Sequence, residues 1–113
     1  MLPPKNRLKK TDFDALGRFK KRIFVSENFT LRTYDSGFKP SRFAVVVSSK
    51  VLKKAVERNK KRRQIKGVII QNADNLLNGF AVIIYLKKEG AKTNFKMLNK
   101  ELSGLFRKSD LLA

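Results

Sequence analysis

The sequence of 113 residues contains neither cysteine nor histidine. Without cysteine the chain forms no disulfide, thiolate metal site or cysteine nucleophile, and without histidine it lacks the commonest general base and metal ligand. Any catalysis would therefore rest on carboxylates. Acids such as Asp12 and Asp14 are more typical of helix caps and of solubility than of a metal site, and the sequence has no glycine-rich phosphate loop. We predict no catalytic residues and no metal ligands.

Acidic residues are scarce. Nine aspartates and glutamates stand against 27 lysines and arginines, which leaves a formal net charge of +18. The mutual repulsion of so many cations opposes compaction unless a polyanion offsets it. Nucleic acid is the first candidate, because cations that neutralise phosphates release condensed counterions and gain affinity. An anionic membrane surface is the second.

Long hydrophobic runs are also missing. The longest unbroken ones, residues 43–47 and 80–86, are far too short to span a bilayer. Residues 1–10 carry charges with no apolar stretch behind them, so they do not resemble a secretory signal. We expect a cytoplasmic protein that does not associate with membranes.

The chain nevertheless has enough apolar residues for a core. Hydrophobic residues make up 42% of it and nine are phenylalanine, so it is not of the disordered type. A length of 113 residues suits one domain and leaves little room for two. We predict a single RNA-binding domain over residues 1–113, with residues 1–10 as an extended basic arm.

Three segments have the patterns of β-strands. Residues 29–34 alternate between apolar and polar, which indicates a half-exposed strand. Residues 42–48 are apolar on both faces, which predicts a central strand. Residues 80–86 are rich in valine, isoleucine and tyrosine and predict a second buried strand.

Three helices are expected around these strands. A short one starts near Thr11, with Thr11 or Asp12 as its cap, and ends at Gly17. A second runs from about Leu52 to Asn72. The third follows a cap at Asn94, and its apolar residues recur at steps of three and four, so it should cover the sheet.

The second helix carries the densest charge, with six cations among the nine residues 58–66. At 3.6 residues per turn, Arg58, Arg62 and Lys66 form one ridge, and Asn59 lies on the next. A charge run is usually a solvated face. Here, however, like charges one turn apart destabilise the helix and Glu57 is almost the only acid nearby, so we expect an external polyanion to supply the counter-charge.

This segment resembles the signature of the bacterial ribonuclease P protein family, Arg-Asn-Arg-x-Lys-Arg-x-x-Arg after an Ala-Val pair. Arg58, Asn59 and Arg63 match outright, while the positions of Lys60, Arg62 and Lys66 exchange one cation for the other. Residues 6–13, 42–50 and 105–108 resemble further blocks of the family in the same order. The likeness therefore spans most of the chain.

The resemblance implies an α/β (α+β) sandwich of the ribosomal S5 domain 2-like type. Three helices would pack on a four-stranded sheet in the order αβββαβα. Two parallel strands would be joined by a left-handed βαβ crossover through the basic helix, which general rules of handedness do not predict.

The resemblance also implies a role as the protein subunit of ribonuclease P, in a holoenzyme of one protein and one RNA. The catalytic RNA and its Mg²⁺ would remove the 5′ leader of precursor tRNA, which forms the mature 5′ end. The basic helix would bind this RNA through the following residues: Lys53, Lys54, Arg58, Asn59, Lys60, Lys61, Arg62, Arg63 and Lys66.

In this family a cleft between the first helix and the sheet holds the single-stranded leader. Binding a single strand without strong sequence readout requires positive charge and aromatic platforms, which Phe13, Arg32 and Tyr34 can provide. Arg32 stands where the family often has tyrosine, and guanidinium stacking can replace ring stacking there. Core packing for Phe13 and a strand-end position for Tyr34 are the structural alternatives.

Two other functions remain open at this point. A ribosomal or general RNA-binding protein would use the same charge without any processing role. A protein nuclease acting alone is disfavoured by the missing histidine and the scarce acids.

Overall fold

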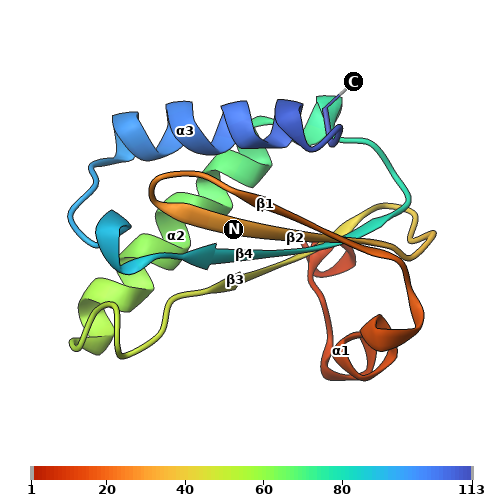
Figure 1. Ribbon diagram of the computed structural model, residues 1–113, viewed down its shortest axis with the longest axis horizontal. Helices are drawn as coiled ribbons and strands as arrows, with labels where there is room; N and C mark the ends of the chain where they lie inside the picture. Colours follow the sequence, from red (N-terminus) through yellow and green to blue (C-terminus); the bar gives the residue numbers. More distant parts are fainter. Residues whose placement is uncertain (1, 113) are drawn as a thin grey trace.

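The computed structural model describes residues 2–112 and has seven main elements (Figure 1). In chain order these are α1 (Lys10–Ala15), β1 (Lys21–Val25), β2 (Phe29–Asp35), β3 (Arg42–Val46), α2 (Ala55–Gln71), β4 (Phe80–Leu86) and α3 (Phe95–Lys108). This is the predicted αβββαβα order. Single 3₁₀ turns at Pro4–Asn6, Leu16–Arg18, Ala73–Asn75 and Lys88–Gly90 connect the elements.

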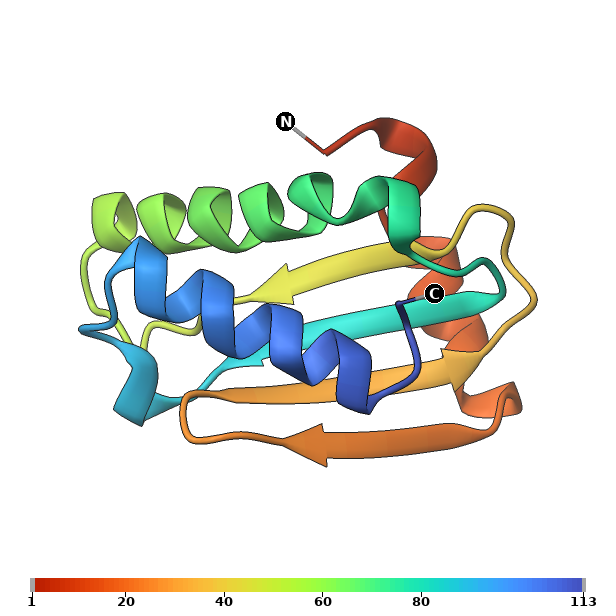
Figure 2. The ribbon, with the colours of Figure 1, turned by 90° about the horizontal axis from the view of Figure 1, so that it is seen from above.

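The four strands form one mixed sheet in the order β1-β2-β4-β3. β1 pairs with β2 and β2 with β4 in antiparallel fashion, while β3 and β4 are parallel and are connected by α2. In Figure 2 both parallel strands run to the left with β4 below β3, and α2, which connects them, runs beside β3 on the face of the sheet that is turned to the viewer. The crossover is therefore left-handed, and the predicted fold class is confirmed.

Helices cover the two faces of the sheet unequally. α2 and α3 lie on one face, and the shorter α1 lies against the other (Figure 1). The larger core fills the space under α2 and α3 and includes Phe29, Ile84 and Phe106, all fully buried. A smaller cluster under α1 contains Leu16, Tyr34, Ala81 and Ile83. The face that carries α1 is only partly covered, and Ile23 and Val25 of β1 stay about half exposed on it.

The prediction that residues 42–48 form a central strand is wrong, because β3 lies at an edge of the sheet. Its apolar residues are shielded from two sides instead. α2 covers one face, and the backbone N–H of Leu8 donates to the carbonyl of Phe43 at 3.0 Å along the outer edge. β2, predicted to be half-exposed, occupies the interior of the sheet, and its residues Phe29, Leu31, Thr33 and Tyr34 are buried.

The pattern of residues alone misses β1, which only the family resemblance implied. This strand lies at the other edge of the sheet, and its side chains are exposed or half-buried throughout. An edge strand with two cations and few buried side chains produces no clear alternation.

Residues 2–10, predicted as part of an extended basic arm, are packed against the domain. Leu2 is buried in the larger core, and the Nε of Arg7 donates to the carbonyl of Leu2 at 2.9 Å. Arg7 also forms a parallel bridge with Phe43. The basic segment thus protects the free edge of β3.

The helix ends differ from the predictions in detail. α1 begins at Lys10, and the carboxylate of Asp12 accepts a hydrogen bond from the backbone N–H of Lys9 at 2.7 Å, one turn back. α2 begins at Ala55, three residues after the predicted start. The Asn94 cap of α3 is confirmed, since its side chain accepts from the N–H of Met97 at 2.9 Å.

Candidate nucleic-acid interface

The predicted RNA-binding residues lie along α2 and the two residues that precede it. We call this set the α2 basic surface: Lys53, Lys54, Arg58, Asn59, Lys60, Lys61, Arg62, Arg63 and Lys66. Five of them are exposed and three are half-buried. The exposed ones are Lys53, Lys54, Asn59, Lys60 and Arg63. Most of the set therefore faces solvent, along α2 and the two residues that precede it.

Lys61 differs from its neighbours because its side chain turns inward. It is only 9% exposed, and its ammonium donates to the carbonyl and, at 3.1 Å, to the hydroxyl of Thr93 in the connection between β4 and α3. Burial lowers the pKa of Lys61, and the neighbouring charge of Lys60 lowers it further. Lys61 therefore joins α2 to this connection and adds buried positive charge.

Two arginines of the α2 basic surface are held by contacts within the chain. One terminal nitrogen of Arg58 donates to the carbonyls of Leu52 and Lys53, at 2.9 and 2.7 Å, where the chain enters the helix. The guanidinium of Arg62 donates to the side-chain oxygen of Asn59. These contacts restrict the side chains before any ligand binds, which lowers the entropy lost on binding.

The cations of α2 have no acidic partners within the described chain. Over residues 2–112 a single ion pair occurs, between Asp12 and Arg42, and it lies on the opposite face of the sheet. The helix itself contains one acid, Glu57, in its first turn. The α2 basic surface is therefore a field of unpaired positive charge suited to a polyanion.

A second candidate surface lies on the sheet face that carries α1. Arg32 of β2 stacks on Tyr85 of β4, with its guanidinium carbon 5.0 Å from the ring centre. A terminal nitrogen of Arg32 donates to the Tyr85 hydroxyl at 3.5 Å. The Nε of Arg32 is buried and has no hydrogen-bond partner. Ile23 and Val25 of β1 are about half exposed on the same face. We call Arg32, Tyr85, Ile23 and Val25 the sheet platform.

The other two residues predicted for the leader differ in exposure. Phe13 lies on α1 and is 41% exposed, so its ring is accessible. Tyr34 lies on the same side of β2 as Arg32, but it is only 8% exposed and packs against Leu16 and Ala81. Tyr85 was not among the predicted site residues. The pairing of β2 with β4 places Tyr85 on the same face as Arg32, and the apolar run of residues 80–86 does not show this by itself.

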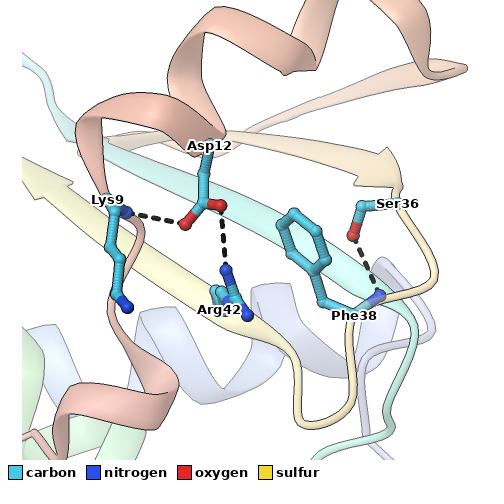
Figure 3. A network of polar contacts seen from close by, with 5 residues as sticks. All are labelled: Lys9, Asp12, Ser36, Phe38 and Arg42. Carbon is cyan, nitrogen blue, oxygen red and sulfur yellow. Dashed lines mark hydrogen bonds and ion pairs between the residues drawn. The ribbon is translucent and has the colours of Figure 1, made fainter.

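A polar network holds α1 against the sheet (Figure 3). The carboxylate of Asp12 accepts from Arg42 of β3 at 2.8 Å and from the backbone of Lys9 at 2.7 Å. The Arg42 guanidinium also lies 4.4 Å from the ring centre of Phe38, which forms a T-shaped aromatic pair with Phe19. This network sets the position of α1, and with it Phe13, over the sheet.

The Asp12 carboxylate should stabilise the fold only when ionised. Burial alone would raise the pKa of Asp12, but the hydrogen bond from Lys9 and the charge of Arg42 outweigh burial and lower it below its ordinary value of 3.8. A lowered pKa means that the stabilisation is complete above about pH 4 and is lost as the pH falls through the folded-state pKa. We expect Asp12→Asn to cost about 1–2 kcal/mol at pH 7 and much less at pH 2.5, measured by urea unfolding. An equal loss at both pH values would contradict the assignment.

Within residues 2–112 no three acidic side chains come together as a metal site would require. No helix in this part of the chain combines the length and apolar character needed to cross a membrane. The two candidate binding surfaces are the α2 basic surface and the sheet platform, which lie on opposite faces of the sheet.

The chain is similar in sequence and in fold to known proteins over nearly its whole length. Residues 2–110 match the family model described as Ribonuclease P. A ribonuclease P protein component from Microcystis aeruginosa is 34% identical, and the alignment covers 98% of this chain and 96% of the relative. The RNase P protein of Staphylococcus aureus has a TM-score of 0.81 at 20% identity, covering 96% of this chain and 98% of that one. The RNase P protein from Thermotoga maritima has a TM-score of 0.79 at 23% identity, covering 90% and 96%.

Proposed function

The chain belongs to the ribonuclease P protein family, and from that premise we propose that it is the protein subunit that binds a catalytic RNA and the 5′ leader of precursor tRNA. The observation that carries the proposal is the α2 basic surface, whose cations have no acidic partner within residues 2–112. Phosphates of RNA supply the missing counter-charge, and arginine and asparagine can add directed hydrogen bonds to phosphate and sugar.

The two surfaces suit two different RNA ligands. The α2 basic surface carries many cations without acidic partners within residues 2–112, which suits the phosphates of the folded catalytic RNA. The sheet platform offers one arginine stacked on an aromatic ring beside half-exposed apolar residues, which suits the bases of a single strand. Because the surfaces lie on opposite faces of one sheet, one small protein can contact both ligands at once.

In this proposal the RNA subunit carries out the endonucleolytic hydrolysis, and the protein contributes affinity and positioning. The side chains present do not fit a metal site of the protein, because no three acids converge within residues 2–112. We therefore assign Mg²⁺ mainly to the RNA. We also propose that one protein and one RNA form the holoenzyme, and that it acts on precursor tRNA in the cytoplasm.

Reconstitution tests this function. The purified protein alone should cut no RNA, whereas with a bacterial ribonuclease P RNA at low Mg²⁺ it should stimulate cleavage that produces the mature tRNA 5′ end. The holoenzyme should also bind precursor tRNA more tightly than mature tRNA. A general RNA-binding protein would show no such preference, and the absence of stimulation would overturn the proposal.

Arg32→Ala should weaken precursor tRNA binding by the holoenzyme roughly tenfold, since stacking on one base contributes about 1–3 kcal/mol. Affinity for mature tRNA should not change, because it lacks the leader. Arg22→Ala is the matched control: Arg22 also stacks on an aromatic ring, that of Phe24, but on the face under the helices. Equal losses in the two variants would show that the sheet platform does not hold the leader.

A further inference from the structure

A cavity of about 350 Å³ opens between the N-terminal half of α2 and the connection from β4 to α3. Its size is at the lower end of the range for small-ligand sites, about 300–1,000 Å³. The side chains that line it and that matter here are Lys60, Lys61, Gln64, Lys92 and Phe95. Only part of this set belongs to the predicted RNA-binding residues, so the cavity extends the α2 basic surface onto a second part of the chain.

The cavity is strongly positive. Three lysines line it, and the only acid in its wall is Glu57. Lys60 and Lys92 are exposed, whereas Lys61 is buried and donates only to neutral oxygens of Thr93. A buried ammonium without a counter-ion is costly, and a bound anion relieves that cost. The cavity is thus suited to a phosphate group.

Gln64 adds a requirement that a bare anion does not meet. Its side-chain oxygen is buried and has no hydrogen-bond partner, although Gln64 lies in the cavity wall. An unpaired buried carbonyl oxygen costs free energy, which a hydrogen-bond donor on a bound ligand recovers. A hydroxyl satisfies either end of an amide because it both donates and accepts. In RNA, the 2′-hydroxyl lies close to a phosphate and can donate to this oxygen.

The third feature is a partly exposed aromatic ring in the wall of the cavity. Phe95 is 42% exposed at the first position of α3, beside the Asn94 cap. A Cβ on Gly67 would lie 3.8 Å from the ring, so Phe95 packs along α2 on one side. Its exposed part leaves a surface on which a base can stack.

From this combination we propose that the cavity holds one ribonucleotide of the ribonuclease P RNA. The phosphate lies among Lys60, Lys61 and Lys92, the 2′-hydroxyl bonds to Gln64, and the base stacks on Phe95. This inference rests on the proposed function. The catalytic RNA is the source because the cavity borders the α2 basic surface, whereas the sheet platform faces the other way.

The experiment compares the affinity of the wild-type protein for ribonuclease P RNA with that of three variants, Lys92→Gln, Gln64→Leu and Phe95→Leu. Each should raise the Kd about fivefold, as expected for one lost contact of about 1 kcal/mol. Lys100→Gln removes the same charge from an exposed site on α3 outside the cavity and should change the Kd less than twofold. Thermal melting of the free proteins checks folding.

Gln64→Leu distinguishes a role in RNA binding from a role in folding, because it should lower RNA affinity without lowering protein stability. Because it removes an unpaired buried polar group, the free variant should melt at the same temperature as the wild type or higher, while binding RNA more weakly. A set of RNAs is then tested, each with one 2′-deoxynucleotide at a different position. At one position this substitution should weaken binding of the wild-type protein but leave binding of Gln64→Leu unchanged. If no position behaves in this way, the hydroxyl contact is wrong.

The remaining outcomes distinguish the sources of the nucleotide and the two proposals. Losses confined to precursor tRNA binding by the holoenzyme would place a substrate nucleotide in the cavity and overturn its assignment to the catalytic RNA. Equal affinities of the cavity variants and Lys100→Gln would overturn the cavity alone. If the protein does not stimulate cleavage but its RNA binding still depends on the cavity residues, the proposed function is overturned and the nucleotide site in the cavity is supported.

Discussion

Replacing Lys54, Lys60 and Arg63 together with glutamine should lower the affinity for ribonuclease P RNA roughly a thousandfold. All three side chains are exposed, and no acid within residues 2–112 pairs with them. A hydrogen bond to a charged group contributes about 1.5–3 kcal/mol, so three lost contacts amount to at least about 4 kcal/mol. The measurement is the equilibrium Kd at physiological salt.

Salt dependence gives an independent measure of the same contacts. If about six cations of the α2 basic surface contact phosphates, log affinity should fall with log salt at a slope of roughly −4 to −5. The triple variant should have a slope shallower by about 2–3, because each lost phosphate contact removes about 0.7–0.9.

The matched control replaces Lys39, Lys100 and Lys108 with glutamine. These lysines are exposed, and none lies in the α2 basic surface or in the cavity. Net charge falls by the same amount in both triple variants. If the control loses as much affinity and slope as the α2 variant, binding follows total charge rather than the helix, and the interface assigned to α2 is wrong.

The second large effect concerns the attachment of α3 to the sheet, which we expect Glu101→Ala to weaken by about 3 kcal/mol. The carboxylate of Glu101 accepts three hydrogen bonds from the β1–β2 turn. They come from the hydroxyl of Ser26 at 2.5 Å and from the backbone and side-chain nitrogens of Asn28 at 2.8 and 2.6 Å. Asn28 is only 6% exposed, so removing the carboxylate leaves its donors buried without partners.

For a domain of this size, a loss of about 3 kcal/mol corresponds to a melting temperature lower by roughly 12–20 °C. Glu27→Ala is the control, because Glu27 is an exposed acid in the same turn and its removal changes the net charge equally. Thermal unfolding of the two variants under identical conditions makes the comparison. Equal melting temperatures would mean that the Glu101 contacts contribute nothing beyond charge.

Local patterns predicted the long elements well. The apolar steps after Asn94 predicted α3 and its cap, and the run of valine, isoleucine and tyrosine predicted β4 with its observed ends. Both signals depend on residues close in the chain, which helix and strand periodicities record directly. β1 produced no such signal, since its residues are exposed or half-buried at a sheet edge.

The place of each strand in the sheet could not be predicted in the same way. An apolar stretch indicates burial but not which element covers it. Residues 42–46 are covered by α2 and by the segment around Leu8 rather than by a strand on each side. An edge strand that is covered in this way and a central strand therefore have the same apolar sequence pattern.

By itself the sequence determined the charge, the basic helix and the family likeness, because these depend on residue types and on spacings of three and four along the chain. Only the tertiary structure decided which of those residues face solvent and which are held by contacts within the chain. It turned Lys61 inward toward Thr93, stacked Arg32 on Tyr85, and paired Asp12 with Arg42. Each of these contacts joins residues about 30 or more positions apart, and periodicity carries no information about such pairs. They arise when the left-handed crossover and the strand order bring distant segments together.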